Sequence, residues 1–215
     1  MAIPTKAGHD GGSVVRFAMF AAAALAACGR VGFDPRGGEN ATEPDGGGTS
    51  PGEDGGSDAA SAGSFGTMEV GISSQNSGSD RVWISRFALT DPAVVHTLTA
   101  HIAPVGAQAT SLRGVIYADA SGGPTTLLGT TTEVALPGSA IPGWVALPLA
   151  TPPSLPPGTY WLGLHTSTQA SIQYRSAAGA TKFAGDIYGD GTDATYAGSA
   201  TTFTMELSIY AEYTR

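Results

Sequence analysis

The feature that most restricts the fold of this chain is a strict alternation of apolar and polar side chains near its end. Between positions 203 and 213, apolar residues occupy the odd positions and mostly polar residues occupy the even ones. Successive side chains of an extended chain point to opposite sides, so the pattern predicts a strand with one buried and one exposed face. A second alternation predicts that Val94, His96 and Leu98 share the buried face of another strand.

Seven further runs have the apolar and β-branched composition of strands. Clusters of Gly, Pro and Asp separate the runs, and no stretch shows the 3.6-residue period of an amphipathic helix. Many short strands with such turns predict an all-β fold, an antiparallel β-sandwich of the jelly-roll-like or Ig-like kind. The runs are 67–72, 81–89, 112–119, 125–136, 143–149, 158–166 and 171–175.

Composition divides the chain into three parts. In residues 1–27, Lys6 and Arg16 precede an apolar run at 17–27, which predicts a secretory signal peptide. That run is shorter than the roughly 20 residues that a membrane-spanning helix needs. Residues 28–63 are rich in Gly, Pro, Ser and acids without apolar periodicity, which predicts a disordered tether. Residues 64–215 carry the strand patterns and are long enough to form one independent core.

The single cysteine of the chain, Cys28, directly follows the apolar run. The sequence Leu25-Ala26-Ala27-Cys28 resembles the lipobox of bacterial lipoproteins, in which the cysteine sulfur receives a diacylglycerol. The resemblance implies that fatty acyl chains, such as palmitate, anchor the protein to a membrane of the cell envelope through Cys28. Asp after the cysteine favours the inner membrane in that family, so Gly29 implies the outer membrane. The alternative is an incidental buried cysteine after an ordinary signal peptide.

Three stretches of the last part also resemble a known module when they are taken in order. They are LRGVIYADASGGPTTLLG, GWVALPLATPPSLPPGTYWLGLHT and FTMELSIYAEYT. Together they resemble a poorly characterised β-sandwich module of secreted bacterial proteins, over nearly all of residues 64–215. Such modules occur beside carbohydrate-active or adhesive domains, so the resemblance implies a binding role and assigns no functional residues.

Four aromatic side chains are candidates for a ligand-binding surface. The strand at 158–166 places its leucines on one face and Trp161 and His165 on the other. Trp144 alternates with apolar neighbours, and Tyr210 lies on the polar face of the last strand. If these faces converge, the four side chains form a platform for a sugar ring. The alternative is a second hydrophobic layer under a loop, because large aromatic residues in β domains mostly serve packing.

One loop is a candidate for a cation. In DIYGDGTDATY, Asp186, Asp190 and Asp193 surround two glycines, and a flexible loop rich in oxygen ligands suits Ca²⁺. The spacing differs from that of an EF-hand loop, and Asp-Gly pairs also form ordinary turns. A structural Ca²⁺ and an ordinary turn are both open interpretations, and the sequence predicts no other cofactor.

Several classes of function are not expected from this sequence. The net charge is −8 and no basic run exists, so nucleic acid is not an expected partner. His96 and His101 are five positions apart on one predicted strand, which places them on opposite faces and argues against a metal pair. The chain has no G-x-S-x-G elbow, and an enzyme is not predicted.

We therefore expect a lipid-anchored envelope protein that displays a β-sandwich binding or adhesion module, with carbohydrate as the candidate ligand. The alternative is a structural or assembly lipoprotein that acts through protein–protein contacts and binds no small ligand.

Overall fold

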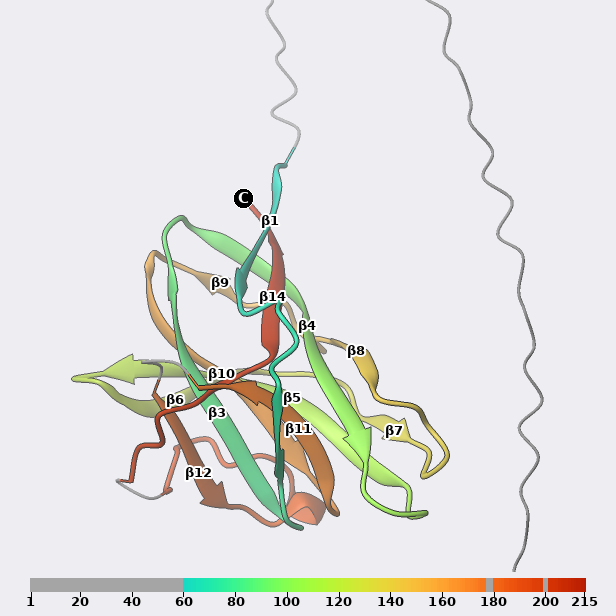
Figure 1. The fold of residues 1–215 in the computed structure, drawn as a ribbon. Coiled ribbons are helices and arrows are strands. Elements are labelled where there is room, and N and C mark those ends of the chain that lie inside the picture. The colour runs from blue at the N-terminus through green and yellow to red at the C-terminus, as the bar shows by residue number, and fades with distance from the viewer. Residues whose placement is uncertain (1–59, 177–179, 199–200) are drawn as a thin grey trace, which may run out of the picture. The chain divides into compact units, whose positions relative to one another are not determined.

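The computed structural model describes residues 60–176, 180–198 and 201–215. They form two antiparallel β-sheets packed face to face, and the predicted all-β sandwich is confirmed (Figure 1). The only helical element within the described ranges is a short 3-10 turn, η1 (Tyr188–Asp190). The predicted signal peptide (1–27), Cys28 and most of the predicted tether (28–63) lie outside the described residues.

The first sheet, which we call sheet A, is built around its longest strand, β4. The strand order is β1-β14-β4-β11-β13, β2 pairs with β11, and β8 and β9 pair with β4. Since β14 and β8 both pair with the middle of β4, they lie on opposite sides of it. The strands are β1 (Ala62–Gly66), β2 (Ser73–Asn76), β4 (Ala93–Pro104), β8 (Gly143–Pro148), β9 (Ser154–Leu155), β11 (Ala170–Arg175), β13 (Glu206–Leu207) and β14 (Ile209–Thr214).

The second sheet, sheet B, has the order β12-β3-β10-β5-β6, with β7 paired to β5. Its two central strands, β3 and β10, match the predicted runs 81–89 and 158–166 residue for residue. The predicted run 125–136 is divided between two strands. The strands are β3 (Arg81–Leu89), β5 (Thr110–Ala120), β6 (Gly123–Thr130), β7 (Val134–Leu136), β10 (Gly158–Thr166) and β12 (Thr181–Gly185).

The predicted strand at 67–72 is wrong, because this segment is irregular. The chain leaves the edge of sheet A after Gly66, whose φ of 115° is readily adopted only by glycine. The segment then crosses to β11. On the way, the Thr67 N–H donates to the Ile209 carbonyl at 2.7 Å and the Gly71 N–H donates to the Ser208 hydroxyl at 2.8 Å. These two N–H groups are therefore satisfied without a continuous strand ladder.

A bulge in β4 changes which of its side chains are buried. The β14 partners are Thr97 for Glu212 but Val95 for Tyr213, so β4 carries one extra residue at this point. The extra residue shifts the side-chain phase, and Val95 joins the core while His96 is exposed. The prediction that Val94 and His96 share the buried face with Leu98 is therefore wrong.

The same bulge corrects the predicted arrangement of the two histidines on β4. His96 bonds through Nε2 to the Thr214 hydroxyl at 2.9 Å on the outer face, and His101 lies on that face beside Trp144. The two histidines thus share the outer face, five positions apart, because one residue of the five is taken up by the bulge.

Apolar side chains form two separate layers. The larger one fills the space between the sheets and includes Leu98, Ile116, Leu162 and Ile209. The smaller one lies on the outer face of sheet B and consists of Val82, Ile84, Val115, Tyr117 and Trp161. Residues 186–198, which we call the covering segment, close over part of this layer. The Leu127 N–H donates to the Ala194 carbonyl at 2.9 Å, and the Tyr196 N–H donates to the Thr125 carbonyl at 2.8 Å.

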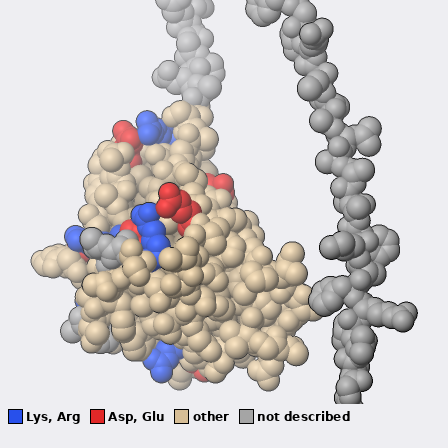
Figure 2. Space-filling model, viewed as in Figure 1, with Lys and Arg blue, Asp and Glu red and all other residues tan. Residues whose placement is uncertain are grey.

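Charged side chains are sparse on this domain, and Figure 2 shows them in a few small groups on an otherwise uncharged face. Between positions 134 and 174 the sequence contains no Asp, Glu, Lys or Arg. One group connects β11, β13 and the irregular segment 67–72. In it, Arg175 pairs with Glu206 at 2.6 Å and with Glu69 at 3.0 Å. The domain surface therefore offers mainly neutral polar and apolar groups to a partner.

Candidate functional site

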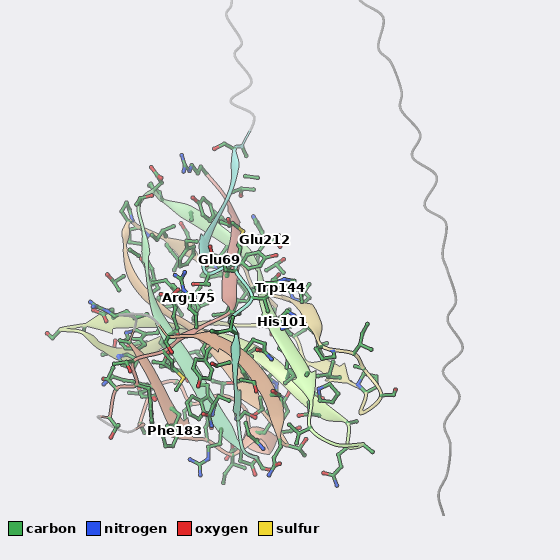
Figure 3. All side chains as sticks on the ribbon, viewed as in Figure 1. Glu69, His101, Trp144, Arg175, Phe183 and Glu212 are labelled. Atoms are coloured by element: carbon green, nitrogen blue, oxygen red, sulfur yellow. The ribbon has the colours of Figure 1, made fainter. Side chains whose placement is uncertain are left out.

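Two of the four predicted platform residues come together on the outer face of sheet A. Trp144 on β8 and Tyr210 on β14 flank β4, and their ring centroids are 5.4 Å apart at 68°. His101 on β4 makes a second edge contact with Trp144 at 5.4 Å and 89° (Figure 3). Trp144 is 38% exposed. Because the rings meet edge to face, they offer one exposed indole and no flat platform.

Trp161 and His165 lie on the other sheet and are fully buried. The predicted alternation of β10 is confirmed, since Leu162 and Leu164 face the core between the sheets. The opposite side of β10 is not solvent, however, because the second apolar layer and the covering segment lie there. The structure therefore does not bring the four side chains into one platform, and the alternative of a second hydrophobic layer describes Trp161.

Both buried side chains have polar partners that fix them. Trp161 Nε1–H donates to Asp119 Oδ1 at 2.8 Å, and Arg86 pairs with the same carboxylate at 3.0 Å. Burial raises the pKa of Asp119, but hydrogen bonds from Arg86, Trp161 and the Gly122 N–H outweigh it, and the pKa lies below its ordinary value. Asp119 is therefore an ionised acceptor for the buried indole.

His165 joins β10 to the covering segment. Its Nε2 lies 2.9 Å from the Asp186 carbonyl and its Nδ1 lies 3.1 Å from the Thr192 hydroxyl. Within the described ranges, the hydrogen-bond partners of His96 and His165 are threonine hydroxyls and this main-chain oxygen. His165 is thus placed to hold the covering segment in position.

The three acids of the predicted calcium loop have different surroundings. Asp186 is buried, and its Oδ2 accepts a hydrogen bond from the Asp193 N–H at 3.1 Å. Burial raises the pKa of Asp186, and the neighbouring carboxylates of Asp193 and Asp190 act in the same direction. In the part of the chain that the structure describes, no three His, Cys, Asp or Glu side chains are grouped to hold a metal ion. The calcium site stays a prediction.

An open cavity of about 420 Å³ lies between β2 of sheet A and β3 and β12 of sheet B, and we call it the aromatic cavity. This volume falls within the range of about 300–1,000 Å³ that is usual for ligand pockets. Phe183, which lines it, is well separated from Trp144 and His101 in Figure 3. The lining residues are Gln75, Asn76, Ser77, Gly78, Arg81, Trp83, Gln169, Phe183 and Phe203.

Three rings form the apolar wall of the cavity. Phe183 and Trp83 are direct partners in the pairing of β12 with β3, and their rings stack at 4.9 Å and 26°. Phe203 lies 5.8 Å from Trp83 and 5.7 Å from Phe183. Trp83 is buried behind the two partly exposed phenylalanines, and its Nε1–H donates to the Ser77 carbonyl at 2.8 Å. The wall is therefore preorganised by β pairing and by one indole hydrogen bond.

Neutral amides form the polar rim. Asn76 Nδ2 donates to Gln169 Oε1 at 3.2 Å, and Asn76 Oδ1 accepts from the Gly78 N–H at 3.0 Å. Gln75 Nε2 donates to the Asn76 carbonyl at 2.9 Å. Gln75 Oε1 and Gln169 Nε2 have no protein partner among the described residues, so the rim offers a ligand both acceptor and donor groups.

An apolar wall beside neutral amides suits a sugar ring. The C–H groups of a pyranose pack on aromatic side chains, while its hydroxyls exchange hydrogen bonds with amides. A second cavity of about 350 Å³ lies near Asp119 and Tyr160. Two of its polar groups are already engaged, because Asp119 binds Arg86 and Trp161 and the Tyr160 hydroxyl donates to the Pro156 carbonyl at 2.7 Å. The aromatic cavity is therefore the better candidate.

The sequence did not reveal the aromatic cavity. Trp83 lies in a strand that was predicted, but Phe183 is in TKFAG, which is too short to show an alternation. Phe203 begins the last alternating run, and this position predicts only that its side chain is on the buried face. The available signal was the clustering of amides at Gln75 and Asn76, directly before the turn that leads into β3.

Comparisons with known proteins leave this site to be judged on its own geometry. No protein-family model matches the chain, and no curated protein matches it significantly. Over the residues that the structure describes, no helix has the length and apolar character needed to cross a membrane.

Proposed function

We propose that this protein is a lipid-anchored protein of the bacterial cell envelope whose β-sandwich binds carbohydrate in the aromatic cavity, without catalysing a reaction. The observation that carries the proposal is the juxtaposition of the Trp83, Phe183 and Phe203 rings with free amide groups of Gln75 and Gln169 in one cavity. The low charge of the surface and the lack of a basic run argue against nucleic acid as the ligand.

The anchor rests on the sequence around Cys28, and Gly29 favours the outer membrane. A protein with two or three acyl chains binds membranes stably, whereas a single chain binds marginally. We expect the intact protein to partition into the detergent phase of a Triton X-114 separation and the Cys28→Ser variant to stay in the aqueous phase. A variant that still partitions into detergent would contradict lipidation at Cys28.

The carbohydrate proposal is tested with the full chain carrying Cys28→Ser, applied to a glycan array. Phe183→Ala and Phe203→Ala remove partly exposed rings of the cavity, and we expect each to lose most of the signal. Trp144→Ala is the matched control, since it removes an exposed ring on the other sheet. Loss of signal in Trp144→Ala alone would move the site to that face, and silence across the whole array would overturn the proposal.

The same array tests the predicted calcium loop at Asp186, Asp190 and Asp193. A structural Ca²⁺ predicts that chelation lowers the signal and that added Ca²⁺ restores it. A signal that is unchanged by chelation would assign the loop to ordinary turn formation.

A second function is favoured by one specific observation. Met68, Val70 and Ile72 are 62%, 49% and 98% exposed on a single irregular segment, and such exposed apolar side chains are typical of protein contacts. A structural or assembly lipoprotein would use this segment. A photo-reactive side chain at position 72 would then form one discrete cross-linked adduct in intact cells, and a pattern no different from that of position 80 would argue against this function.

A further inference from the structure

The described arginines differ in whether a carboxylate of the protein pairs with them. The described residues contain five arginines, and four of them form ion pairs with carboxylates. Arg81 is the exception, since no carboxylate pairs with it within the described ranges. The four pairs are Arg86 with Asp119, Arg113 with Glu133, Arg175 with Glu69 and Glu206, and Arg215 with Asp91.

Arg81 lines the aromatic cavity. Its guanidinium carbon lies 5.1 Å from the centroid of the Phe183 ring, a cation–π contact that holds the side chain at the wall. Its aliphatic stem lies against Gly78, because a Cβ placed on Gly78 would meet Arg81 Cγ at 3.3 Å. The guanidinium is thus positioned by contacts that leave its N–H groups without an anionic partner.

Among the described residues, no acid lines the aromatic cavity. The nine lining residues include neither Asp nor Glu. The nearest acid in sequence, Asp80, accepts a hydrogen bond from the Tyr188 N–H at 3.0 Å through Oδ1 and so serves the covering segment. The cavity therefore combines an apolar wall, a neutral rim and one unpaired positive charge.

We propose that the aromatic cavity selects sugars that carry a carboxylate, namely uronic acids, and that Arg81 binds the carboxylate. This inference rests on the proposed carbohydrate function and names the class of sugar. The planar guanidinium presents parallel N–H groups that match the two oxygens of a carboxylate, and such charge-assisted bonds are stronger than bonds between neutral groups. The ring of the same sugar packs on Phe183 and Phe203, and its hydroxyls reach the rim amides.

The test compares matched ligands on one array. Oligosaccharides of uronic acids are printed beside the same oligosaccharides after reduction of the C6 carboxylate to a hydroxymethyl group. The full chain carrying Cys28→Ser is applied at low salt, and we expect about ten-fold or greater weakening when the carboxylate is reduced. The preference is expressed as the ratio of the two affinities, that for the uronic acid divided by that for its reduced form. Raising the ionic strength from about 0.1 M to about 1 M should lower this ratio, because screening shortens the Debye length from roughly 10 Å to roughly 3 Å.

Variants assign the preference to one side chain. Arg81→Gln should bring the ratio close to one while neutral sugars still bind, and Arg81→Lys should restore part of it because the charge remains. Arg215→Gln is the control, since Arg215 lies in the ion pair with Asp91 outside the cavity. Phe183→Ala should weaken both members of each matched pair.

The outcomes separate the two proposals. Equal binding of both members, or binding of neutral sugars alone, overturns the selection by Arg81 and leaves the carbohydrate function standing. A preference for the carboxylate that survives in Arg81→Gln also overturns it. Silence of the whole array overturns the carbohydrate function, and the selection falls with it.

Discussion

The outer face of each sheet carries a tryptophan, and the two tryptophans differ in exposure to solvent. Trp144 on β8 and Trp161 on β10 both point away from the core between the sheets. On sheet A nothing among the described residues covers Trp144 completely, and it stays 38% exposed. On sheet B the second apolar layer, with the covering segment over part of it, leaves Trp161 fully buried. The position of a residue in a strand therefore determines the face of the sheet on which its side chain lies. Whether that face is buried from solvent depends on a segment distant in sequence.

Removal of the buried indole should have the largest effect on stability. Trp161→Ala should lower the free energy of unfolding by about 3–5 kcal/mol, the usual cost of deleting a fully buried large aromatic side chain. Urea denaturation followed by circular dichroism measures it. A loss below about 1 kcal/mol would show that the outer face of sheet B tolerates solvent as the outer face of sheet A does.

Asp119→Ala tests the polar support of the same indole and should have the next largest effect. The substitution leaves the buried Trp161 Nε1–H without an acceptor, which costs about 1–3 kcal/mol. Because the pKa of Asp119 is below its ordinary value, its contribution is present above the ordinary pKa of an aspartate and is lost as the pH falls through the folded-state value. The stability difference between wild type and variant should therefore shrink on acidification, as denaturation at several pH values would show.

Trp144→Ala is the matched change on sheet A and should cost only about 1 kcal/mol. The loss consists of two edge-to-face contacts, with Tyr210 and His101, on a side chain that solvent already reaches. The same urea titration supplies the comparison with Trp161→Ala. A loss of stability as large as that of Trp161→Ala would mean that the partly exposed indole stabilises the fold as much as the buried one.

Asp186→Asn should give the smallest change in the free energy of unfolding. Unlike the three substitutions above, it should not destabilise the protein at neutral pH. Burial raises the pKa of Asp186, so the ionised folded form is disfavoured and wild-type stability falls as the pH rises from the ordinary aspartate pKa through the raised value. Asparagine keeps an oxygen for the Asp193 N–H and has no charge to bury. We expect the variant to be at least as stable as wild type at neutral pH and to lack the gain on acidification. Thermal unfolding at pH 4 and pH 7 tests both points.

Local pattern predicted much of this fold, because the two-residue period is a property of the extended chain itself. It assigned Leu207, Ile209, Ala211 and Tyr213 to the buried face, and the structure confirms all four. It failed at Val95, where one extra residue in β4 reverses the phase without any signal in composition. A bulge is defined by the partner strand, so a single strand read alone does not contain it.

The candidate site depends on contacts that are distant in sequence, which explains why it was not predicted. Gln75, Trp83, Gln169 and Phe203 come from four separate stretches of the chain and meet only when the two sheets pack. The predicted platform combined two strands of sheet A with one of sheet B, and periodicity could not show that Trp161 and His165 lie under a covering segment. Local sequence shows which side chains share a face of a strand. It does not show which segment packs over that face.

The pairing of β1 with β14 has a mechanical consequence for an anchored protein. The described chain enters beside the C terminus, at the end of the sandwich opposite the turn between β2 and β3 where the aromatic cavity opens (Figure 1). A force between a lipid on the N-terminal side and a sugar in the cavity would pull β1 along its own axis. Its five residue pairs with β14 would then be loaded in shear and resist together, rather than open one after another.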